Sequence, residues 1–302
     1  MSITFKEVEH TYSENTPFSY HALKGIDLNI KTGSMTALIG HTGSGKSTLI
    51  QHINALLLPT AGEIKVDDIL ITATDKPETL KPLRKKAGLV FQFPEYQLFE
   101  ETILKDIIFG PKNFGVNEEE AIEIAKETLE LVGLDESYLE KSPFDLSGGQ
   151  KRRVAIAGIL AMNPDILILD EPTAGLDVLA RDELLDVLRK YMEEDESRSI
   201  LISSHISSDL EGLCDDLYMI HNGHVIMHEE TDVLLSDYAI LKLDQNQYQK
   251  LDRQYILRIK KEPFGYSCLT NQKQYYLDNY PSIVVEKGNI DDVIMLMIKG
   301  EK

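Results

Sequence analysis

The fold of this chain is decided by the stretch Gly40-His41-Thr42-Gly43-Ser44-Gly45-Lys46-Ser47-Thr48. This stretch fits the pattern G-x-x-x-x-G-K-[ST], which cradles phosphates when a strand precedes it and a helix follows it. Residues 36–40 form a short apolar run that predicts a strand, and residues 46–57 predict a helix that stops before Pro59. The sequence therefore predicts a nucleotide triphosphate site at this loop.

The residue types within the loop each have a physical reason. Gly43 and Gly45 permit a backbone path that turns N–H groups inward toward phosphate oxygens. The N-terminus of the following helix adds a partial positive charge. We expect Lys46 to reach the β- and γ-phosphates, and the Ser47 hydroxyl to ligate Mg²⁺. A glycine-rich turn without a ligand is the alternative.

Two adjacent acids end a second apolar run. Residues 166–169 are Ile-Leu-Ile-Leu and are followed by Asp170 and Glu171, as expected for a strand of a parallel sheet covered on both faces. Two carboxylates at such a place cost desolvation energy unless a cation compensates. We therefore expect Asp170 to hold Mg²⁺ through water, and Glu171 to polarise the attacking water as the general base.

A third segment, Leu146-Ser147-Gly148-Gly149-Gln150, opens a helix about twenty residues before the acids. It presents a hydroxyl and backbone donors at a positively polarised helix N-terminus. The chain has no second phosphate-binding loop for this segment to serve. An ordinary helix cap is the alternative interpretation.

The three segments, in this order, resemble the ATP-binding cassette (ABC) ATPases. The resemblance implies an α/β fold, a P-loop NTPase of the ABC type, with ATP and Mg²⁺ as ligands. Alternating apolar residues in the first thirty positions predict β-structure, which the resemblance implies is an antiparallel β-subdomain, and residues of about 95–155 predict a helical subdomain. We expect a nucleotide-binding domain at 1–230 and a small α/β accessory domain at 231–302.

The resemblance also implies roles for residues outside these segments. His205 resembles the switch histidine that contacts the γ-phosphate, and Gln92 resembles the Q-loop glutamine that touches Mg²⁺ and the attacking water. Tyr12 is a candidate to stack on adenine, because an aromatic face suits a flat base; packing in the β-core is the alternative.

In ABC ATPases the segment that corresponds to residues 146–150 caps the γ-phosphate on the opposite subunit. Residues 174–177 (Ala-Gly-Leu-Asp) resemble the D-loop, which lines the same interface, so Asp177 joins the candidate set. The resemblance therefore implies a head-to-tail dimer with a second ABC ATPase subunit, either a homodimer or a heterodimer. The candidate catalytic residues are Glu171, His205 and Gln92, and the candidate metal ligands are Ser47, Gln92 and Asp170.

Two further stretches bear on the kind of transporter. Residues 91–99 and 109–113, within a first half that extends to about residue 177, resemble energy-coupling factor (ECF) importer ATPases, which drive uptake of vitamins or metal ions. Residues 203–211 and the tail at 231–302 resemble ATPases of ABC-2-type exporters, so the chain is a possible mosaic. We favour the ECF interpretation, because the loop around Gln92 is where a membrane partner docks in this family.

Composition narrows the remaining function classes. The 302 residues include 31 basic and 50 acidic ones, a net charge of −19, which argues against nucleic acid as a partner and against an ABC ATPase acting on DNA or ribosomes. The basic cluster Lys151, Arg152 and Arg153 is interpreted as solvated helix surface. No apolar run approaches a membrane span, so we expect integral membrane subunits as partners and a cytoplasmic location, peripheral on the inner face of the cell membrane. Cys214 and Cys268 are expected to be free thiols.

Overall fold

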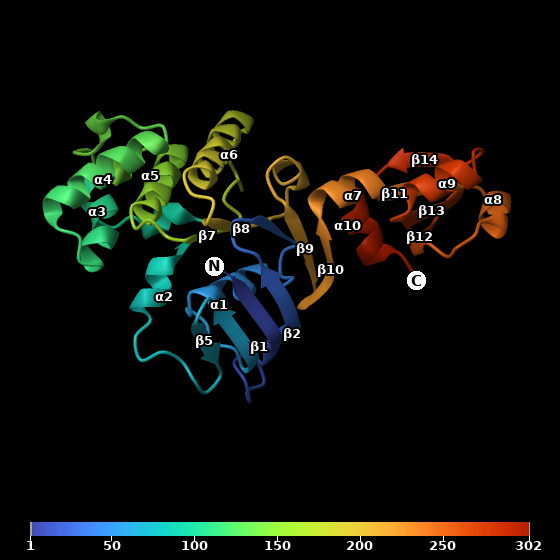
Figure 1. The fold of residues 1–302 in the computed structure, drawn as a ribbon, viewed down its shortest axis with the longest axis horizontal. Coiled ribbons are helices and arrows are strands. Elements are labelled where there is room, and N and C mark those ends of the chain that lie inside the picture. The colour runs from blue at the N-terminus through green and yellow to red at the C-terminus, as the bar shows by residue number, and fades with distance from the viewer. Residues whose placement is uncertain (1, 302) are drawn as a thin grey trace.

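A six-stranded sheet lies at the centre of the computed structural model, which describes residues 2–301 (Figure 1). Strand β3 (Met35–Ile39), which enters the glycine loop, lies inside this sheet, in the order β10-β9-β3-β8-β7-β6. All neighbours run parallel except β10, which pairs antiparallel with β9. The carboxyl ends of the parallel strands thus share one edge, where ligands bind in open α/β sheets. The other strands are β6 (Ala87–Val90), β7 (Ile166–Asp170), β8 (Ser199–Ser204), β9 (Asp216–His221) and β10 (His224–Glu230).

A second, four-stranded antiparallel sheet packs against the first through helix α1 (Lys46–Ile53). Alternation along β7 explains the layering: Ile166 and Ile168 share a core with Leu49 of α1, whereas Leu167 and Leu169 pack into the opposite layer. The predicted N-terminal antiparallel subdomain is therefore confirmed. Its strands are β1 (Ile3–Tyr12), β2 (Tyr20–Ile30), β4 (Ala61–Val66) and β5 (Ile69–Thr72), in the order β2-β1-β4-β5.

Helix α1 ends at Ile53, four residues before the predicted end at Leu57. Ala55 has a φ of 53°, and the Leu56 N–H donates to the Gln51 carbonyl oxygen at 2.9 Å and to the side-chain oxygen of Asn54 at 3.3 Å. An asparagine that hydrogen-bonds its own backbone two residues on offers the chain a turn in place of a helix. The prediction of a longer helix was therefore wrong, because it relied on Pro59 as the only stop signal.

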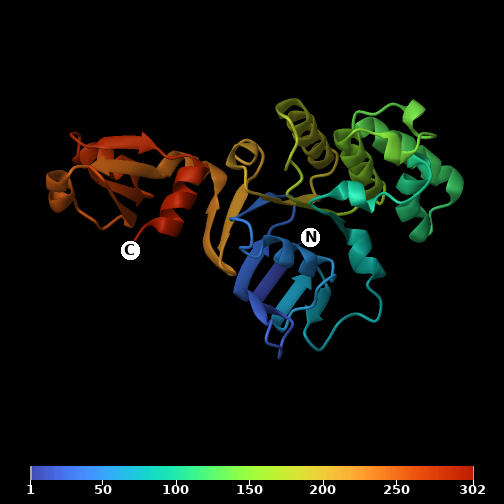
Figure 2. The same cartoon turned by 180° about the vertical axis from the view of Figure 1, so that it is seen from behind.

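Helices cover the other face of the central sheet and form one end of the molecule. Leu184 and Leu188 of α6 (Val178–Glu193) are buried against this face. Beyond the β6 edge a group of helices forms the predicted helical subdomain (Figures 1 and 2). Its members are α3 (Ile103–Asn113), α4 (Glu118–Leu131) and α5 (Gly148–Leu160). A 3₁₀ turn at Pro94–Gln97 leads from β6 to α3, two more at Glu136–Tyr138 and Pro143–Asp145 lie between α4 and α5, and α2 (Lys81–Lys86) lies between β5 and β6.

The C-terminal part forms the opposite end of the molecule (Figure 1). Its four antiparallel strands have the order β12-β13-β11-β14, and Leu241, Leu251 and Cys268 are buried in a core of its own. The predicted small α/β unit is present. Its elements are α7 (Thr231–Asp237), β11 (Ala239–Leu243), α8 (Gln245–Lys250), β12 (Ile256–Glu262), β13 (Gly265–Thr270), α9 (Lys273–Asn279), β14 (Val284–Lys287) and α10 (Ile290–Lys299).

Helix α10 joins this part to the rest of the molecule. Its buried residues Ile290, Val293 and Leu296 belong to the same hydrophobic core as Leu210 and Cys214, which lie beside the central sheet. One continuous apolar core therefore runs from the helical end through the sheet to α10. Across residues 2–301, no helix has the length and apolar character needed to cross a bilayer.

A histidine pair is buried beneath the glycine loop. His52 Nδ1 lies 2.6 Å from the Thr48 carbonyl oxygen, and His52 Nε2 lies 3.2 Å from His10 Nδ1. With His52 Nδ1–H donating to Thr48, its Nε2 is an acceptor, so His10 must carry a proton on Nδ1, which also lies 3.0 Å from the Leu58 carbonyl oxygen. Burial lowers the pKa of His52 to about 4, and burial also lowers the pKa of His10. The pair is therefore neutral in the folded protein at neutral pH.

Replacing His52 with glutamine is expected to flatten the dependence of stability on pH between 6.5 and 4. The unfolded chain binds a proton near pH 6.5, but the folded chain resists it down to a pKa of about 4. The wild type keeps this stability above pH 6.5 and loses it as the pH falls, by about 2 kcal/mol relative to the variant at pH 5. Urea unfolding at pH 7, 6 and 5 measures the difference. Replacement of the exposed His224 is the control, and parallel curves for the His52 variant and the wild type would contradict the expectation.

Candidate nucleotide-binding and hydrolysis site

The glycine loop has the open backbone that phosphate binding requires. Gly43 has a φ of 80° and Gly45 a φ of 113°, conformations that L side chains rarely adopt. Gly45 is also the N-cap of α1, so the helix N-terminus points its free N–H groups at the loop. A cavity of about 170 Å³ lies here and is lined by Tyr20, Ala22, Thr42, Gly43, Gly45, Lys46, Ser47, Thr48, Gln92 and Glu171.

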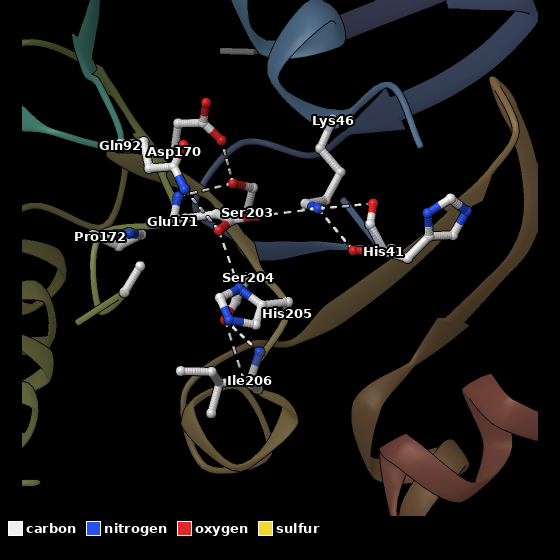
Figure 3. A network of polar contacts seen from close by, with 12 residues as sticks. His41, Lys46, Gln92, Asp170, Glu171, Pro172, Ser203, Ser204, His205 and Ile206 are labelled. Atoms are coloured by element: carbon white, nitrogen blue, oxygen red, sulfur yellow. Dashed lines mark hydrogen bonds and ion pairs between the residues drawn. The ribbon is translucent and has the colours of Figure 1, made fainter. Parts of the chain in front are cut away.

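Lys46 is held inside the loop with its charge poised toward the cavity. Its side chain is 4% exposed, and Nζ donates to the Gly40 carbonyl oxygen at 2.7 Å. The same Nζ lies 3.2 Å from Glu171 Oε1 (Figure 3). A buried ammonium needs such partners, because an unpaired buried charge is costly. A phosphate oxygen would satisfy the same ammonium.

The three candidate catalytic residues meet at one carboxylate. Glu171 Oε2 accepts from Gln92 Nε2 at 3.1 Å and lies 3.0 Å from His205 Nδ1. Figure 3 shows Lys46, Gln92 and His205 converging on Glu171 from three separate segments. These residues lie up to 159 positions apart in the sequence (205 − 46), and the shared edge of the sheet brings them together.

The backbone of Glu171 is held in a rarely populated conformation. Glu171 has a φ of 47°, and its N–H donates to the carbonyl oxygen of Ser203 at 3.1 Å and to Ser203 Oγ at 2.9 Å. Ser203 Oγ in turn donates to Asp170 Oδ1 at 2.6 Å. A non-glycine residue at positive φ persists only where its surroundings fix it, and such residues cluster at active sites.

Ser203 was not predicted as a site residue. It faces Asp170 in the parallel register of β7 and β8. A signal was available in the sequence, because Ser203 and Ser204 are polar residues at the end of an otherwise apolar strand.

A hairpin turn supports the outer side of the loop. Asn222 and Gly223 have φ values of 50° and 82°, the positive values that a type I′ hairpin turn requires at both central residues. The Gly223 N–H donates to the Ser44 carbonyl oxygen at 2.9 Å, and His221 Nδ1 lies 3.1 Å from His41 Nε2. Burial, and to a lesser degree His41, lowers the pKa of His221. The His41 side chain thus contacts the turn, a partner that the sequence did not indicate.

The two aromatic candidates beside the loop differ in position. Tyr12 packs edge-on against His10, with ring centroids 4.5 Å apart, and its hydroxyl lies 3.1 Å from Thr48 Oγ1. Tyr20 lines the cavity, whereas Tyr12 is absent from its lining. Tyr20 is a residue that the sequence did not single out. Adenine stacking by Tyr12 stays a prediction.

The segment at residues 146–150 lies outside this cavity. Ser147 caps α5: its Oγ accepts from the Gln150 N–H at 3.3 Å, and Gln150 Oε1 accepts from the Ser147 N–H at 3.0 Å. Ser147 and Gly148 are exposed, and Gly148 and Gly149 have open space where a Cβ would stand. Asp177 is the exposed N-cap of α6. The structure therefore does not bring these residues to the loop of their own chain.

Arg152 connects the parts of the site. Its Nη1 donates to the carbonyl oxygens of Pro172 and Ala174 at 2.9 and 2.8 Å, and its Nη2 lies 3.5 Å from the Gln92 carbonyl oxygen. Burial lowers its pKa, and Glu95, 3.9 Å away, opposes that shift. The interpretation of Arg152 as solvated surface was wrong, because a side chain that satisfies this many carbonyls is buried at the junction of the segments.

The oxygen atoms present fit Mg²⁺ better than a transition metal. Ser47 and Gln92 both line the cavity, and Asp170 ends the neighbouring strand with its carboxylate buried. Hydroxyl, amide and carboxylate oxygens are what Mg²⁺ prefers, and it commonly shares its shell with substrate phosphates and water. Across residues 2–301, no group of three or more His, Cys, Asp or Glu side chains could hold a metal ion alone.

Comparison with known proteins agrees with this geometry. The sequence profile of the family described as ABC transporter matches residues 23–174. The energy-coupling factor transporter ATP-binding protein EcfA2 of Lactococcus lactis is 55% identical over 224 residues, which cover 74% of this chain and 77% of that protein. A match of this length continues beyond residue 177, and the comparisons give no support to the exporter alternative or to the nucleic acid alternative.

Two solved structures are similar in fold. The cbiO1 protein of Clostridium perfringens, described as part of the ABC transporter complex cbiONQ, has a TM-score of 0.67 at 38% identity and covers 76% of this chain and 88% of its own. A dimeric ATP-binding cassette, MJ0796, bound to ADP and Pi has a TM-score of 0.68 at 32% identity and covers 76% and 98%. The chain belongs to the ABC transporter ATPase family.

Proposed function

We propose that this chain is the ATP-hydrolysing subunit of an ECF-type importer for a vitamin or metal ion. The observation that carries the proposal is the meeting of Lys46, Gln92 and His205 at the carboxylate of Glu171. The 55% identity to an energy-coupling factor ATP-binding protein supports the transport class. Residues 1–230 then act as the nucleotide-binding domain, with a helical subdomain at about 95–155, and residues 231–302 act as an accessory domain.

The side chains divide the work of hydrolysis. Lys46 and the loop N–H groups hold the triphosphate. Its phosphate oxygens take the place of Glu171 Oε1 as the partner of Lys46 Nζ. The carboxylate of Glu171 then becomes free to accept a proton from water, with His205 and Gln92 within hydrogen-bond reach to orient the reacting groups. Mg²⁺ bound through Ser47, Gln92 and Asp170 would neutralise phosphate charge.

A second ATPase subunit completes each site. The exposed Ser147 and Gly148 offer a hydroxyl and helix N-terminal donors, and the exposed Asp177 begins the neighbouring α6. Neither segment lines the cavity of its own chain, so in a head-to-tail dimer Ser147 and Gly148 would cap the γ-phosphate of a partner and Asp177 would line the same interface. The dimeric MJ0796 cassette with ADP and Pi supports this assembly.

A groove on the helical subdomain accepts the integral membrane subunits. It encloses about 630 Å³, and its lining includes Leu98, Phe99, Phe109 and Met162. Phe99 and Phe109 are 58% and 46% exposed, an apolar surface suited to a docked helix. The segment after Gln92 enters this groove, so partner movement reaches the residue that touches Glu171. The chain accordingly works at the inner face of the cell membrane.

Phe109→Asp is expected to weaken capture of the membrane subunits at least roughly tenfold, because a charge would be buried in an apolar contact. The tagged chain is purified from detergent-solubilised membranes, and associated proteins are identified by mass spectrometry. Phe264→Asp is the matched control, since Phe264 is 98% exposed on the C-terminal part. The proposal is supported if integral membrane transporter subunits co-purify with the wild type and with the Phe264→Asp control. Ribosomal proteins or nucleic acid in their place would overturn it.

A further inference from the structure

One ion pair between a partly exposed arginine, whose side chain is 26% exposed, and a buried aspartate connects α6 to the segment that follows His205. Arg181 Nη1 lies 3.3 Å from Asp209 Oδ1, and the Asp209 side chain is 4% exposed. Arg181 stands on the first turns of α6, and Asp209 ends the 3₁₀ turn Ser207–Asp209. The two residues are 28 positions apart, so the contact belongs to the tertiary fold.

The pair is poorly satisfied for its burial. Arg181 Nε and Asp209 Oδ2 are both buried and have no hydrogen-bond partner among the groups that the structure describes, which do not include the side chain of Ser208. An arginine and a carboxylate commonly form two parallel hydrogen bonds, whereas this pair has one long contact. A buried ion pair that leaves polar atoms unpaired is weak evidence for stabilisation. Such a pair can be retained because it fixes the relative position of two segments.

The segments that it joins lie next to two candidate site residues, Asp177 and His205. The Arg181 N–H donates to the Asp177 carbonyl oxygen at 3.0 Å, one helical turn back on the D-loop. On the other side, the Leu210 N–H donates to the Ser207 carbonyl oxygen at 2.9 Å, and the fully buried Leu210 anchors this turn in the core. His205 lies two residues before the turn and 3.0 Å from Glu171.

We propose that Arg181 and Asp209 are positioning residues that set His205 relative to the D-loop. This inference rests on the proposed function, in which Asp177 faces a second subunit. Movement of the D-loop at that interface would reach Arg181 through the first turn of α6, and Asp209 would pass it to the turn that follows His205. Hydrolysis then proceeds only when the partner is in place.

Asp209→Asn tests the proposal, because it keeps the shape and removes the charge. We expect kcat for ATP to fall roughly tenfold while KM stays within about twofold, since positioning acts on the transition state. In a His205→Ala background the same change should have no further effect, because residues that act as one unit are non-additive. The charge exchange Arg181→Asp with Asp209→Arg should recover part of the rate.

The control is Asp186→Asn, which removes an exposed ion pair with Arg189 on the same helix and should leave kcat and KM unchanged. If Asp209→Asn does not fold, Arg181→Lys provides the same comparison, because lysine keeps the charge without the fork. A normal kcat in a folded Asp209 or Arg181 variant would overturn the proposal, as would an equal loss with and without His205. By contrast, a wild type that shows no ATPase activity, or a His205→Ala variant as fast as the wild type, would contradict the proposed function itself.

Discussion

Glu171→Gln is expected to slow ATP hydrolysis by about 10²–10⁴-fold, the range that a general base contributes, while ATP binding stays intact or becomes tighter. An amide cannot accept the proton from water, but it keeps the size of the side chain and can still hydrogen-bond. It also removes the negative charge that holds Lys46 Nζ at 3.2 Å. The triphosphate then no longer competes with a carboxylate at position 171 for the Lys46 ammonium.

Phosphate release in a single turnover measures the first effect, and equilibrium nucleotide binding measures the second. The variant should also accumulate as a closed dimer in ATP, visible by size-exclusion chromatography. Glu183→Gln is the control, because Glu183 pairs with Arg153 at 3.3 Å, away from the cavity. If Glu171→Gln hydrolysed ATP at the wild-type rate, the general base would have to be another residue.

Mixing two inactive variants is expected to restore about a quarter of the wild-type activity, if exchange is statistical in a symmetric dimer. One variant is Ser147→Asp and the other is Glu171→Gln, combined in equal amounts before ATP is added. Aspartate is a good N-cap, so the change keeps α5 capped but places a negative charge where the partner's γ-phosphate would lie. Half the dimers are then mixed, and each has one intact site.

Asn117→Asp is the matched control, since Asn117 caps α4 with a hydrogen bond to the Glu120 N–H at 2.9 Å and lies far from the loop. It should leave the activity unchanged. Two results together would rule out shared sites: no recovery in the mixture, and a rate per subunit that is independent of protein concentration.

The local parts of the fold and site could be predicted because their signals are local. The apolar run at residues 36–40 is the strand β3, Met35–Ile39, and the run at residues 166–169 with Asp170 is the strand β7, Ile166–Asp170, since apolar runs act on their neighbours. The end of α1 was missed because Asn54 stops the helix earlier than Pro59 could.

Residues that depend on long-range register could not be predicted in the same way. Ser203 becomes part of the site because β8 lies beside β7, and Arg152 because its helix crosses two distant loops. The polar end of β8 marks Ser203 as unusual, but the flanking sequence does not identify the partner of Ser203 or of Arg152. Strand β12 was also missed, because nearly all its residues are half-buried and no alternation marks a face.

The apolar layer between α10 and the cassette limits how the protein can be modified or diversify. Helix α10 completes the packing around Leu210 and Cys214 with its residues Ile290, Val293 and Leu296. Leu210 and Cys214 follow shortly after His205 in the sequence. Exchanging the tail for that of another ATPase would therefore replace part of the cassette's interior. Substitutions in α10 and in the residues around Leu210 must therefore evolve together. A graft that keeps only the glycine loop, Asp170 and Glu171 would leave this contact badly packed.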